Sequence, residues 1–417
     1  MFELMDAIVV EGPVASFPML SLSSFFTRKW HSAYAAVEDG QIDCKWLSKY
    51  LAQQVPQEGV QVYSLDGTAW VRSRARTMDD RQYVYHPSAA INGGSVFVGY
   101  PYSLLDWVPE PHSSWSLSVD VQRIPSSQTA QEAGVEQVKA LCDTRQAYTQ
   151  VLDIVAGDNK YGNARFLRPL RGYRSGVTVR LRCDRVLYRD PEPPPVRKRG
   201  RPRVHGERFA FKEPETWGKA DEVIELEDDH WGQVRLERWN NLHGKNGADV
   251  PFDVVRASVH MERDKPPKPI WLAWQPPPVI PEGIQVTAET IWRSYHHRFP
   301  VEPSIRFRKQ KLGWTMPQFQ LKEAGDCWTI LVALANWLLF LACPVVEELP
   351  FPWQRSQKRF TPQRVQQSIK AIFEEFGSPT RAPKLRGKSP GWTKGSQRTL
   401  KKRFPVVKKH PKPAPVA

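Results

Sequence analysis

The chain has 417 residues, of which 41% are hydrophobic and 11% aromatic, so it carries enough apolar side chains for a sizeable core and is not disordered throughout. Lys and Arg (59) exceed Asp and Glu (44), a net charge of +15, and twelve cations with no acid lie in residues 379–417. This balance favours a polyanionic partner, nucleic acid before an anionic membrane.

The five cysteines are far apart in the sequence and include no Cys-x-x-Cys pair; they are Cys44, Cys142, Cys183, Cys327 and Cys343. This spacing excludes a zinc finger, and the odd number indicates free thiols in a reducing compartment. The first residues lack the charged and apolar regions of a signal peptide. We therefore expect a cytoplasmic protein.

Residues 1–58 are predicted to be helical, with Asp43 as the N-cap of one helix. A strand-rich first part of the core follows over 59–189. We expect strands at 60–65, 96–100, 115–121, 151–156 and 177–181, and helices at 128–141 and 164–167. The order β-β-β-α-β-α-β resembles that of the ribonuclease-H-like fold, a mixed five-stranded sheet flanked by helices, which should finish with a helix.

The expected final helix does not come next. Residues 190–284 begin with a proline-rich, then basic loop and continue as mixed strand, which predicts a β-rich insertion. A helical pattern resumes at Thr287, in a second part of the core over 285–346. Residues 347–417 are predicted to hold a helix at 362–376 and a basic tail. The predicted class is α/β, with the core interrupted by the insertion.

One segment is apolar enough to raise the question of a membrane. The segment 327–346 is 20 residues long and carries no charged side chain, and this length could span a bilayer. Asn336 lies in the middle of this segment, and Pro344 ends the helical stretch after about 17 residues, the lower limit for a span. These features favour a buried core helix over a membrane span, and we expect no membrane partner.

Three carboxylates are candidates for a metal site. Asp66 follows the first strand and Asp158 the fourth, and these two strands are neighbours in a ribonuclease-H-like sheet, about 4.8 Å apart. Glu302, from a later helix, would complete the set. Such oxygen ligands suit Mg²⁺ or Mn²⁺, and two ions about 3.5–4 Å apart can activate an attacking hydroxyl and stabilise the leaving oxygen of a phosphodiester.

The third carboxylate lies within a spaced pattern of four residues, Tyr295, Arg298, Glu302 and Lys309. Glu302 and Lys309 are two helical turns apart on one face, and Tyr295 and Arg298 are one turn apart. Pro300 should break the helix and place Glu302 near the start of a new one. Arg298 and Lys309 could then contact the DNA backbone.

This Y-R-E-K spacing, together with the two aspartates, resembles the DDE transposases of bacterial insertion sequences, and within them the group with a β-rich insertion. Further segments that carry the resemblance are LDGTAWVR, AGDNKYG, GRPRVHGERF and RAPKLRGKSPGW. The resemblance implies metal-dependent cleavage and strand transfer on double-stranded DNA, with recognition of terminal inverted repeats. It also implies a nucleoid-associated bacterial protein and leaves open a homodimer in the DNA complex.

Each candidate ligand also has a purely structural interpretation. Asp66 precedes a glycine, and Asp-Gly is a common turn pair. Asp158 could form an Asx-turn, and Asp153, inside the strand, is a competing acid. Glu302 could serve only as an acid at a helix start. The acid-rich stretch 213–229 is best interpreted as a solvated face.

The basic loop of the insertion offers a separate candidate for DNA contact. Arg199, Arg201 and Arg203 lie in an Arg-rich run that would fit the narrow minor groove of A·T-rich DNA. The alternative is a solvated basic loop without a partner.

Two other functions compete with transposition. The chain could be a non-catalytic DNA-binding relic of a transposase, or a metal-dependent endonuclease that cuts without strand transfer. Metal-dependent nicking of supercoiled DNA separates the enzyme from the relic, and joining of a donor end to a target separates the transposase from the nuclease.

Overall fold

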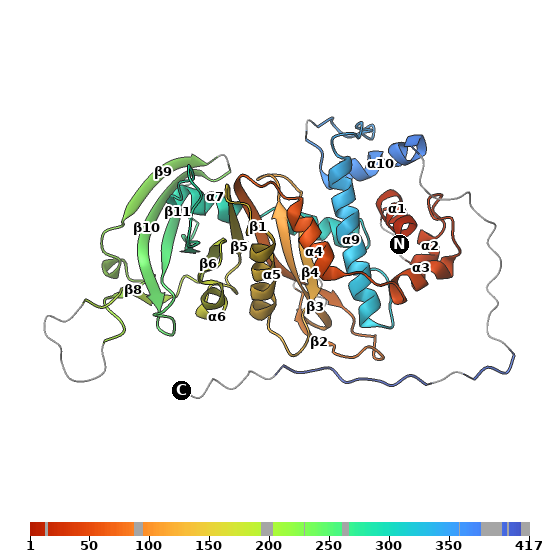
Figure 1. Ribbon diagram of the computed structural model, residues 1–417, viewed down its shortest axis with the longest axis horizontal. Coiled ribbons are helices and arrows are strands. Elements are labelled where there is room, and N and C mark those ends of the chain that lie inside the picture. The colour runs from red at the N-terminus through yellow and green to blue at the C-terminus, as the bar shows by residue number, and fades with distance from the viewer. Residues whose placement is uncertain are drawn as a thin grey trace.

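The computed structural model describes residues 1–12, 16–86, 95–192, 203–228, 230–260, 267–357, 359–376, 394–397 and 400–409. A large mixed sheet runs through the molecule, with several helices gathered at one of its ends (Figure 1). The strands are β1 Gly59–Val71, β2 Gln82–Tyr85, β3 Val96–Val108, β4 Leu117–Arg123, β5 Val151–Gly157, β6 Gly176–Leu181, β7 Val186–Tyr188, β8 Arg208–Ala210, β9 Glu222–Asp228, β10 Gly232–Gly244, β11 Phe252–His260 and β12 Ile270–Gln275. The α-helices are α1 Phe2–Glu11, α2 Phe17–Leu20, α3 Trp30–Glu38, α4 Cys44–Gln53, α5 Ala130–Thr144, α6 Ala164–Leu167, α7 Ala288–His296, α8 Val301–Gln310, α9 Lys322–Ala342 and α10 Pro362–Phe376.

The strands join in the order β2-β3-β1-β5-β6-β12-β11-β10-β7-β8, with β4 on β3 and β9 on β10. β1 is antiparallel to β3 and parallel to β5, and β5 is parallel to β6. The first and fourth predicted strands, β1 and β5, are therefore neighbours, as expected. β3 is longer than expected, since it continues from Val96 to Val108.

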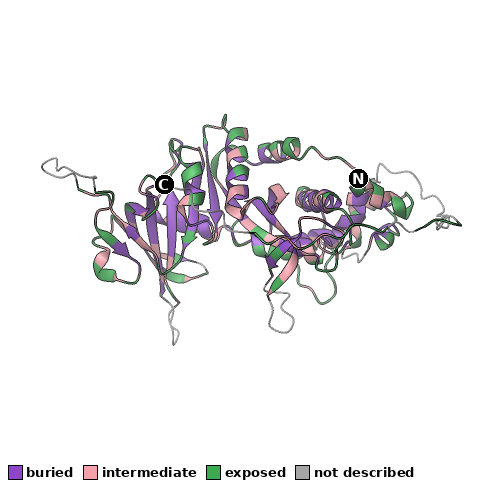
Figure 2. Ribbon diagram, turned by 90° about the horizontal axis from the view of Figure 1, so that it is seen from below, coloured by how far each residue is buried: buried purple, intermediate pink, exposed green. Residues whose placement is uncertain are grey.

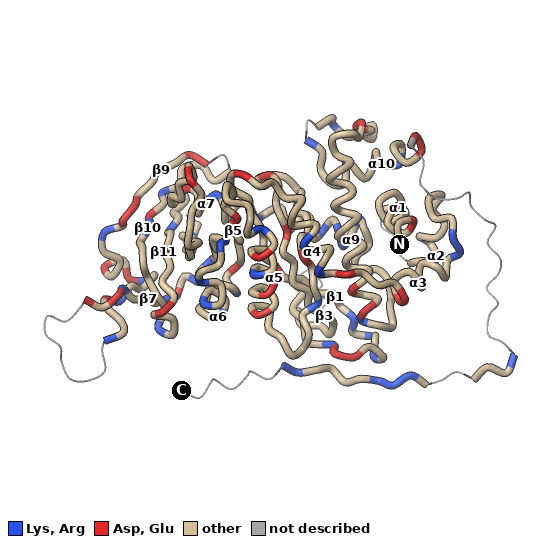
Figure 3. Tube along the Cα trace, in the orientation of Figure 1, with Lys and Arg blue, Asp and Glu red and all other residues tan. Residues whose placement is uncertain are grey.

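The strands of the predicted insertion continue this sheet. β12 pairs antiparallel with β6, and β11 and β10 follow it outward. Apolar residues on both faces explain the extension: Phe211 stacks on Trp271 with ring centroids 3.9 Å apart. On the other face, Trp292 of α7 packs among side chains of β5, β10, β11 and β12. The acid-rich edge strand β9 alternates exposed and partly buried residues and lies at the outer end of the sheet, as a solvated face should (Figure 3).

The N-terminal helices are anchored to the core by a buried arginine. Asp43 caps α4 as predicted, with its carboxylate 3.0 Å from the Trp46 amide. Arg145, at the end of α5, donates to Asp153 at 2.9 Å and to the carbonyl oxygens of Ala52, Val55 and Pro56. Asp153 is thereby held in a structural ion pair on β5, which removes it as a competing metal ligand.

Helix α9 contains the apolar segment 327–346 as far as Ala342 and packs along β4. By length and composition α9 could cross a membrane, but 72% of its most apolar window is buried inside the protein. Asn336 donates to the Ser116 carbonyl at 2.9 Å, and the Trp337 indole donates to the Ser118 carbonyl at 2.7 Å. The Asn336 amide group and the Trp337 indole thus donate to backbone carbonyls at the start of β4, and the prediction of a buried core helix is confirmed (Figure 2).

The helical region after the insertion divides at Pro300, as predicted. α7 begins after its N-cap Thr287, and α8 begins at Val301 with Pro300 as the preceding residue. α8 is held to the sheet by a buried ion pair, because Arg308 donates to Asp106 of β3 at 2.5 Å and to the Ser118 hydroxyl at 2.6 Å. The predicted helix α10 also has the expected bounds.

Candidate active site

Asp66 and Asp158 lie side by side on the parallel pair β1 and β5. The pairing of these two strands ends at Leu65 opposite Gly157, so Asp66 is the next residue of β1 and Asp158 is the first residue after β5. Leu65 faces Gly134 of α5. Because side chains alternate along a strand, Asp66 points to the opposite face of the sheet, towards α7 and α8.

The prediction that Asp66 ends its strand is wrong, because β1 continues to Val71 and Asp66 pairs with Leu104 of β3. Asp66 is therefore not a turn residue, which removes its structural alternative. The Asx-turn at Asp158 is real, since Oδ1 accepts the Lys160 amide at 3.1 Å. Asp158 Oδ2 still faces the Lys160 ammonium, so the turn orients this carboxylate and leaves its second oxygen available to a cation.

Lys160 places a cation between the two carboxylates, and sequence reasoning missed it. Its Nζ lies 3.4 Å from Asp66 Oδ1 and 4.0 Å from Asp158 Oδ2. Burial disfavours the ammonium, but the charges of Tyr161, Asp66 and Asp158 raise the pKa of Lys160 overall. The signal available in the sequence was the Asp-x-Lys spacing after β5, which has no meaning until the two strands are seen together.

Arg298 and Tyr295 come together near this pair. The Arg298 guanidinium lies over the Tyr295 ring, 4.9 Å from its centroid, and donates to the Tyr295 hydroxyl at 3.3 Å. Burial lowers the pKa of Arg298, but the charges of Tyr295, Asp66 and Asp158 outweigh it and raise that pKa overall. The arginine of the four-residue pattern thus lies within the electrostatic field of both aspartates.

Glu302 occupies the first turn of α8, as predicted. Its side chain is exposed and makes no hydrogen bond or ion pair with a described residue. Its two interpretations, metal ligand and helix-start acid, both stay open. Within the described ranges no three His, Cys, Asp or Glu side chains lie close enough to hold a metal ion. The metal ligation by Asp66, Asp158 and Glu302 therefore stays a prediction.

Lys309 is engaged with the sheet backbone. Its Nζ donates to the Ala69 carbonyl of β1 at 3.1 Å and lies 5.9 Å from the centroid of Trp314. Burial, followed by the charge of neighbouring Arg308, lowers the pKa of Lys309 to about 8. A phosphate contact by Lys309 would have to compete with this backbone bond.

Of the three arginines predicted in the basic loop, only Arg203 lies among the described residues. Arg199 and Arg201 lie outside the described residues. Arg203 is exposed and donates to the Gly206 carbonyl at 3.5 Å. Contact of these three arginines with DNA stays a prediction.

Comparison with known proteins identifies the class. A family model described as "DDE superfamily endonuclease" matches residues 4–243, more than half of the chain. The chain belongs to this family and is thereby assigned to the nucleic-acid-cleaving enzymes of the DDE class. The matched range contains Asp66 and Asp158 and ends before Glu302.

Two further comparisons add little. Among solved structures, the chain is similar to piggyBac transposase in a cryo-EM synaptic complex with hairpin DNA. The identity is 12% and the TM-score 0.39, and the match covers 94% of this chain and 77% of that chain. No curated protein matches.

Proposed function

We propose that the protein is a DNA transposase of the insertion-sequence type, which cleaves the ends of its element and joins them to a target with Mg²⁺ or Mn²⁺. The observation that carries the proposal is that Asp66 of β1 and Asp158, directly after the adjacent parallel strand β5, both lie beside the Lys160 ammonium. Membership of the DDE endonuclease family supports it independently. Within the DDE transposases, we place the protein in the group with the Y-R-E-K pattern, on the basis of Tyr295, Arg298, Glu302 and Lys309 in its sequence.

The catalytic core would be ribonuclease-H-like. Five strands lie in the order β4-β3-β1-β5-β6, with β3 antiparallel to its neighbours and β1, β5 and β6 parallel. α5 packs on the face of β3 opposite Asp66. This arrangement supports the order expected from the sequence, and the strands of 190–284 would then be an insertion that lengthens the same sheet.

The direction of α8 supports Glu302 as the third ligand. Ser304 contacts the Ser116 carbonyl and Arg308 the Ser118 hydroxyl, so α8 runs in the direction of β4, which is also that of β1. Lys309 touches Ala69. Glu302 lies about 10 Å before Lys309 on the same helix face. Asp66 lies about 10 Å before Ala69 on its strand, so the two carboxylates are at a similar level.

The donor set fits a divalent metal. The candidate ligands are carboxylates, and the Lys160 ammonium beside Asp66 and Asp158 supports a cation-binding environment at this pair. Two bound ions would supply a metal-activated nucleophile and charge stabilisation at the phosphodiester. The chain itself would orient the carboxylates through β1, β5 and the Asx-turn.

Arg298, Tyr295 and Lys309 would position the DNA backbone. The buried Arg298 guanidinium packs on Tyr295 and feels the charges of Asp66 and Asp158, so it would stabilise a phosphate bound at that pair. The partners would be double-stranded DNA with terminal inverted repeats and target DNA, bound by a homodimer. The protein would act in the bacterial cytoplasm, at the nucleoid.

The deciding experiment uses a supercoiled plasmid that carries the DNA flanking this gene. Nicking at the element ends with Mg²⁺, followed by joining of those ends to a second plasmid, supports transposition. Nicking without joining would favour a nuclease. DNA binding without metal-dependent nicking would favour a catalytically inactive relic.

A further inference from the structure

The C-terminal segment 400–409 lies against the outer edge of the sheet. β2 ends the strand order, and Val407 forms a parallel bridge with Gln82 at its start. The Val407 amide donates to the Arg81 carbonyl at 2.7 Å, and the Phe404 amide donates to the Arg76 carbonyl at 2.9 Å. The segment passes below β2 in Figure 1. An otherwise open sheet edge is therefore partly paired by a segment more than 300 residues away in the sequence.

Side chains reinforce this docking. The Arg81 guanidinium donates to the Phe404 carbonyl at 3.0 Å, and Lys409 Nζ donates to the Gln128 carbonyl at 2.5 Å. Burial lowers the pKa of Lys409, and the charges of Asp80 and Glu132 oppose that effect. The apolar side chains of Phe404, Val406 and Val407 are half-buried, whereas the cationic side chains of the segment are exposed.

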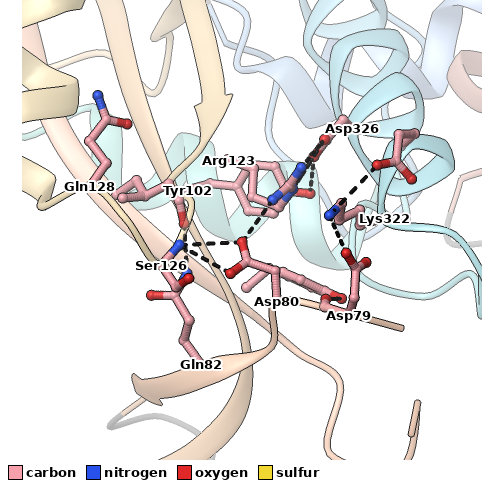
Figure 4. Close-up of polar contacts among 12 residues, drawn as sticks. Asp79, Asp80, Gln82, Tyr102, Arg123, Ser126, Gln128, Lys322 and Asp326 are labelled. Atoms are coloured by element: carbon pink, nitrogen blue, oxygen red, sulfur yellow. Dashed lines mark hydrogen bonds and ion pairs between the residues drawn. The ribbon is translucent and has the colours of Figure 1, made fainter. Parts of the chain in front are cut away.

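The carboxylates near the docked segment are already paired. Asp79 accepts from Lys322 at 2.5 Å, and Asp80 accepts from Arg123 at 3.4 Å and from the Ser126 amide (Figure 4). Their ion-pair partners are therefore core residues and not the described cations of the segment. The exposed cations of the segment, which Figure 3 shows as blue stretches along the tail, include Lys401, Lys402, Arg403 and Lys408. Arg74 and Arg76, after β1, are also exposed, and the Arg76 carbonyl accepts the Phe404 amide of the segment.

We propose that residues 400–409 dock on the edge of β2 and that this docked segment, with Arg74 and Arg76, forms a surface for the phosphate backbone of duplex DNA. The inference rests on the proposed function, since it takes DNA as the partner. An extended segment from Lys401 to Lys409 spans at most roughly 27 Å, over which a duplex carries about 16 phosphate charges. Cations held on a sheet edge lose less conformational freedom on binding than cations on a free chain.

The test separates docking from charge with two proline variants. Val407→Pro removes the N–H that donates to Arg81 and keeps every charge. Val406→Pro is the matched control, because it removes the same side chain one residue earlier, where the amide makes no hydrogen bond with a described residue. A third variant replaces Lys401, Lys402, Arg403 and Lys408 with glutamine; it loses the Lys401–Gln320 bond and keeps the backbone docking bonds of Phe404 and Val407.

Docking is measured on the free protein by hydrogen exchange of residues 400–409 and by trypsin cleavage after Lys402. DNA binding is measured with a labelled linear duplex of mixed sequence over a series of salt concentrations. We expect faster exchange and cleavage for Val407→Pro only. The four-glutamine variant should lower the slope of log affinity against log salt by up to about 3.6, and Val407→Pro should weaken binding at least threefold with part of that loss of slope.

Four results would overturn the inference. Equal exchange in Val407→Pro, Val406→Pro and the wild type would show that the segment is not docked as described. Faster exchange in Val407→Pro with unchanged DNA affinity would show that the tail cations work as a free chain. If the wild-type protein bound anionic vesicles but no duplex, both the DNA partner and the proposed function would be wrong. If the wild-type protein nicked the plasmid and the four-glutamine variant bound DNA as tightly as the wild type, only the proposed surface would be wrong.

Discussion

Lys160 Nζ lies 3.4 Å from Oδ1 of Asp66, although Asp66 lies on β1 and Lys160 in the turn after β5, 94 positions away. The same ammonium lies 4.0 Å from Asp158. Lys160 therefore offsets the repulsion between two carboxylates that face each other across β1 and β5. A metal ion bound at this pair would have to displace the ammonium or share the carboxylates with it.

We predict that Lys160→Met raises the affinity for Mg²⁺ or Mn²⁺, because it removes a competing cation. A partly exposed ion pair of this kind contributes about 0.2–1 kcal/mol, so the gain should be up to about fivefold. Isothermal titration calorimetry without DNA measures it. Lys139→Met on α5, whose ammonium instead lies over the Tyr173 ring, is the control and should leave metal affinity unchanged. A lower metal affinity in Lys160→Met would mean that Lys160 supports the ligands instead of competing with the metal.

We predict that Asp66→Ala, Asp158→Ala and Glu302→Ala each abolish DNA cleavage and leave DNA binding largely intact, since each removes a metal ligand. The loss should exceed the roughly 10- to 100-fold effect of removing a residue that only orients a ligand. Plasmid nicking and a gel-shift assay measure the two properties. Glu289→Ala, a partly exposed acid on α7 paired with Arg293, should cut normally. Near-normal cleavage by Glu302→Ala would mean that Glu302 is not a metal ligand and only stabilises the start of α8.

We predict that Arg298→Ala and Lys309→Ala weaken binding of the element end more than they weaken metal binding. A charge-assisted phosphate contact contributes about 1.5–3 kcal/mol, so affinity for the end should fall about ten- to a hundredfold. A gel-shift assay with DNA of the element end measures DNA binding, and calorimetry with Mg²⁺ measures metal binding. Lys311→Ala, at the end of α8, is the control. Loss of metal binding with intact DNA binding would reverse the roles assigned to these residues.

We predict that Arg308→Met lowers the free energy of unfolding by about 3–5 kcal/mol, because it leaves Asp106 buried without its partner. The side chains of Arg308 and Asp106 are 2% and 0% exposed. Urea denaturation measures the effect, with Arg306→Met on the exposed face of α8 as the control. Combining Arg308→Met with Asp106→Asn should recover most of the loss. If the single variant were as stable as the wild type, this ion pair would not anchor α8.

The local features of the fold were predictable from the sequence. Asp43 as a cap, the break at Pro300 and the buried helix around Asn336 all depend on neighbours within a few residues. Capping, proline geometry and apolar periodicity act over that range, so a single sequence reveals them. The neighbourhood of Asp66 and Asp158 was predictable for a different reason, because the order of elements limited how the strands could pair.

The tertiary structure alone decided the features that depend on pairing between distant segments. Nothing in the pattern of 270–275 says that β12 would pair with β6, that Lys160 would reach Asp66, or that Val407 would meet β2. Alternating apolar residues show that a strand has a face to bury, but they do not name the strand beside it. Partner choice follows from the packing of the whole sheet. The sequence by itself therefore determined which residues could act, and the tertiary structure decided which of them lie together.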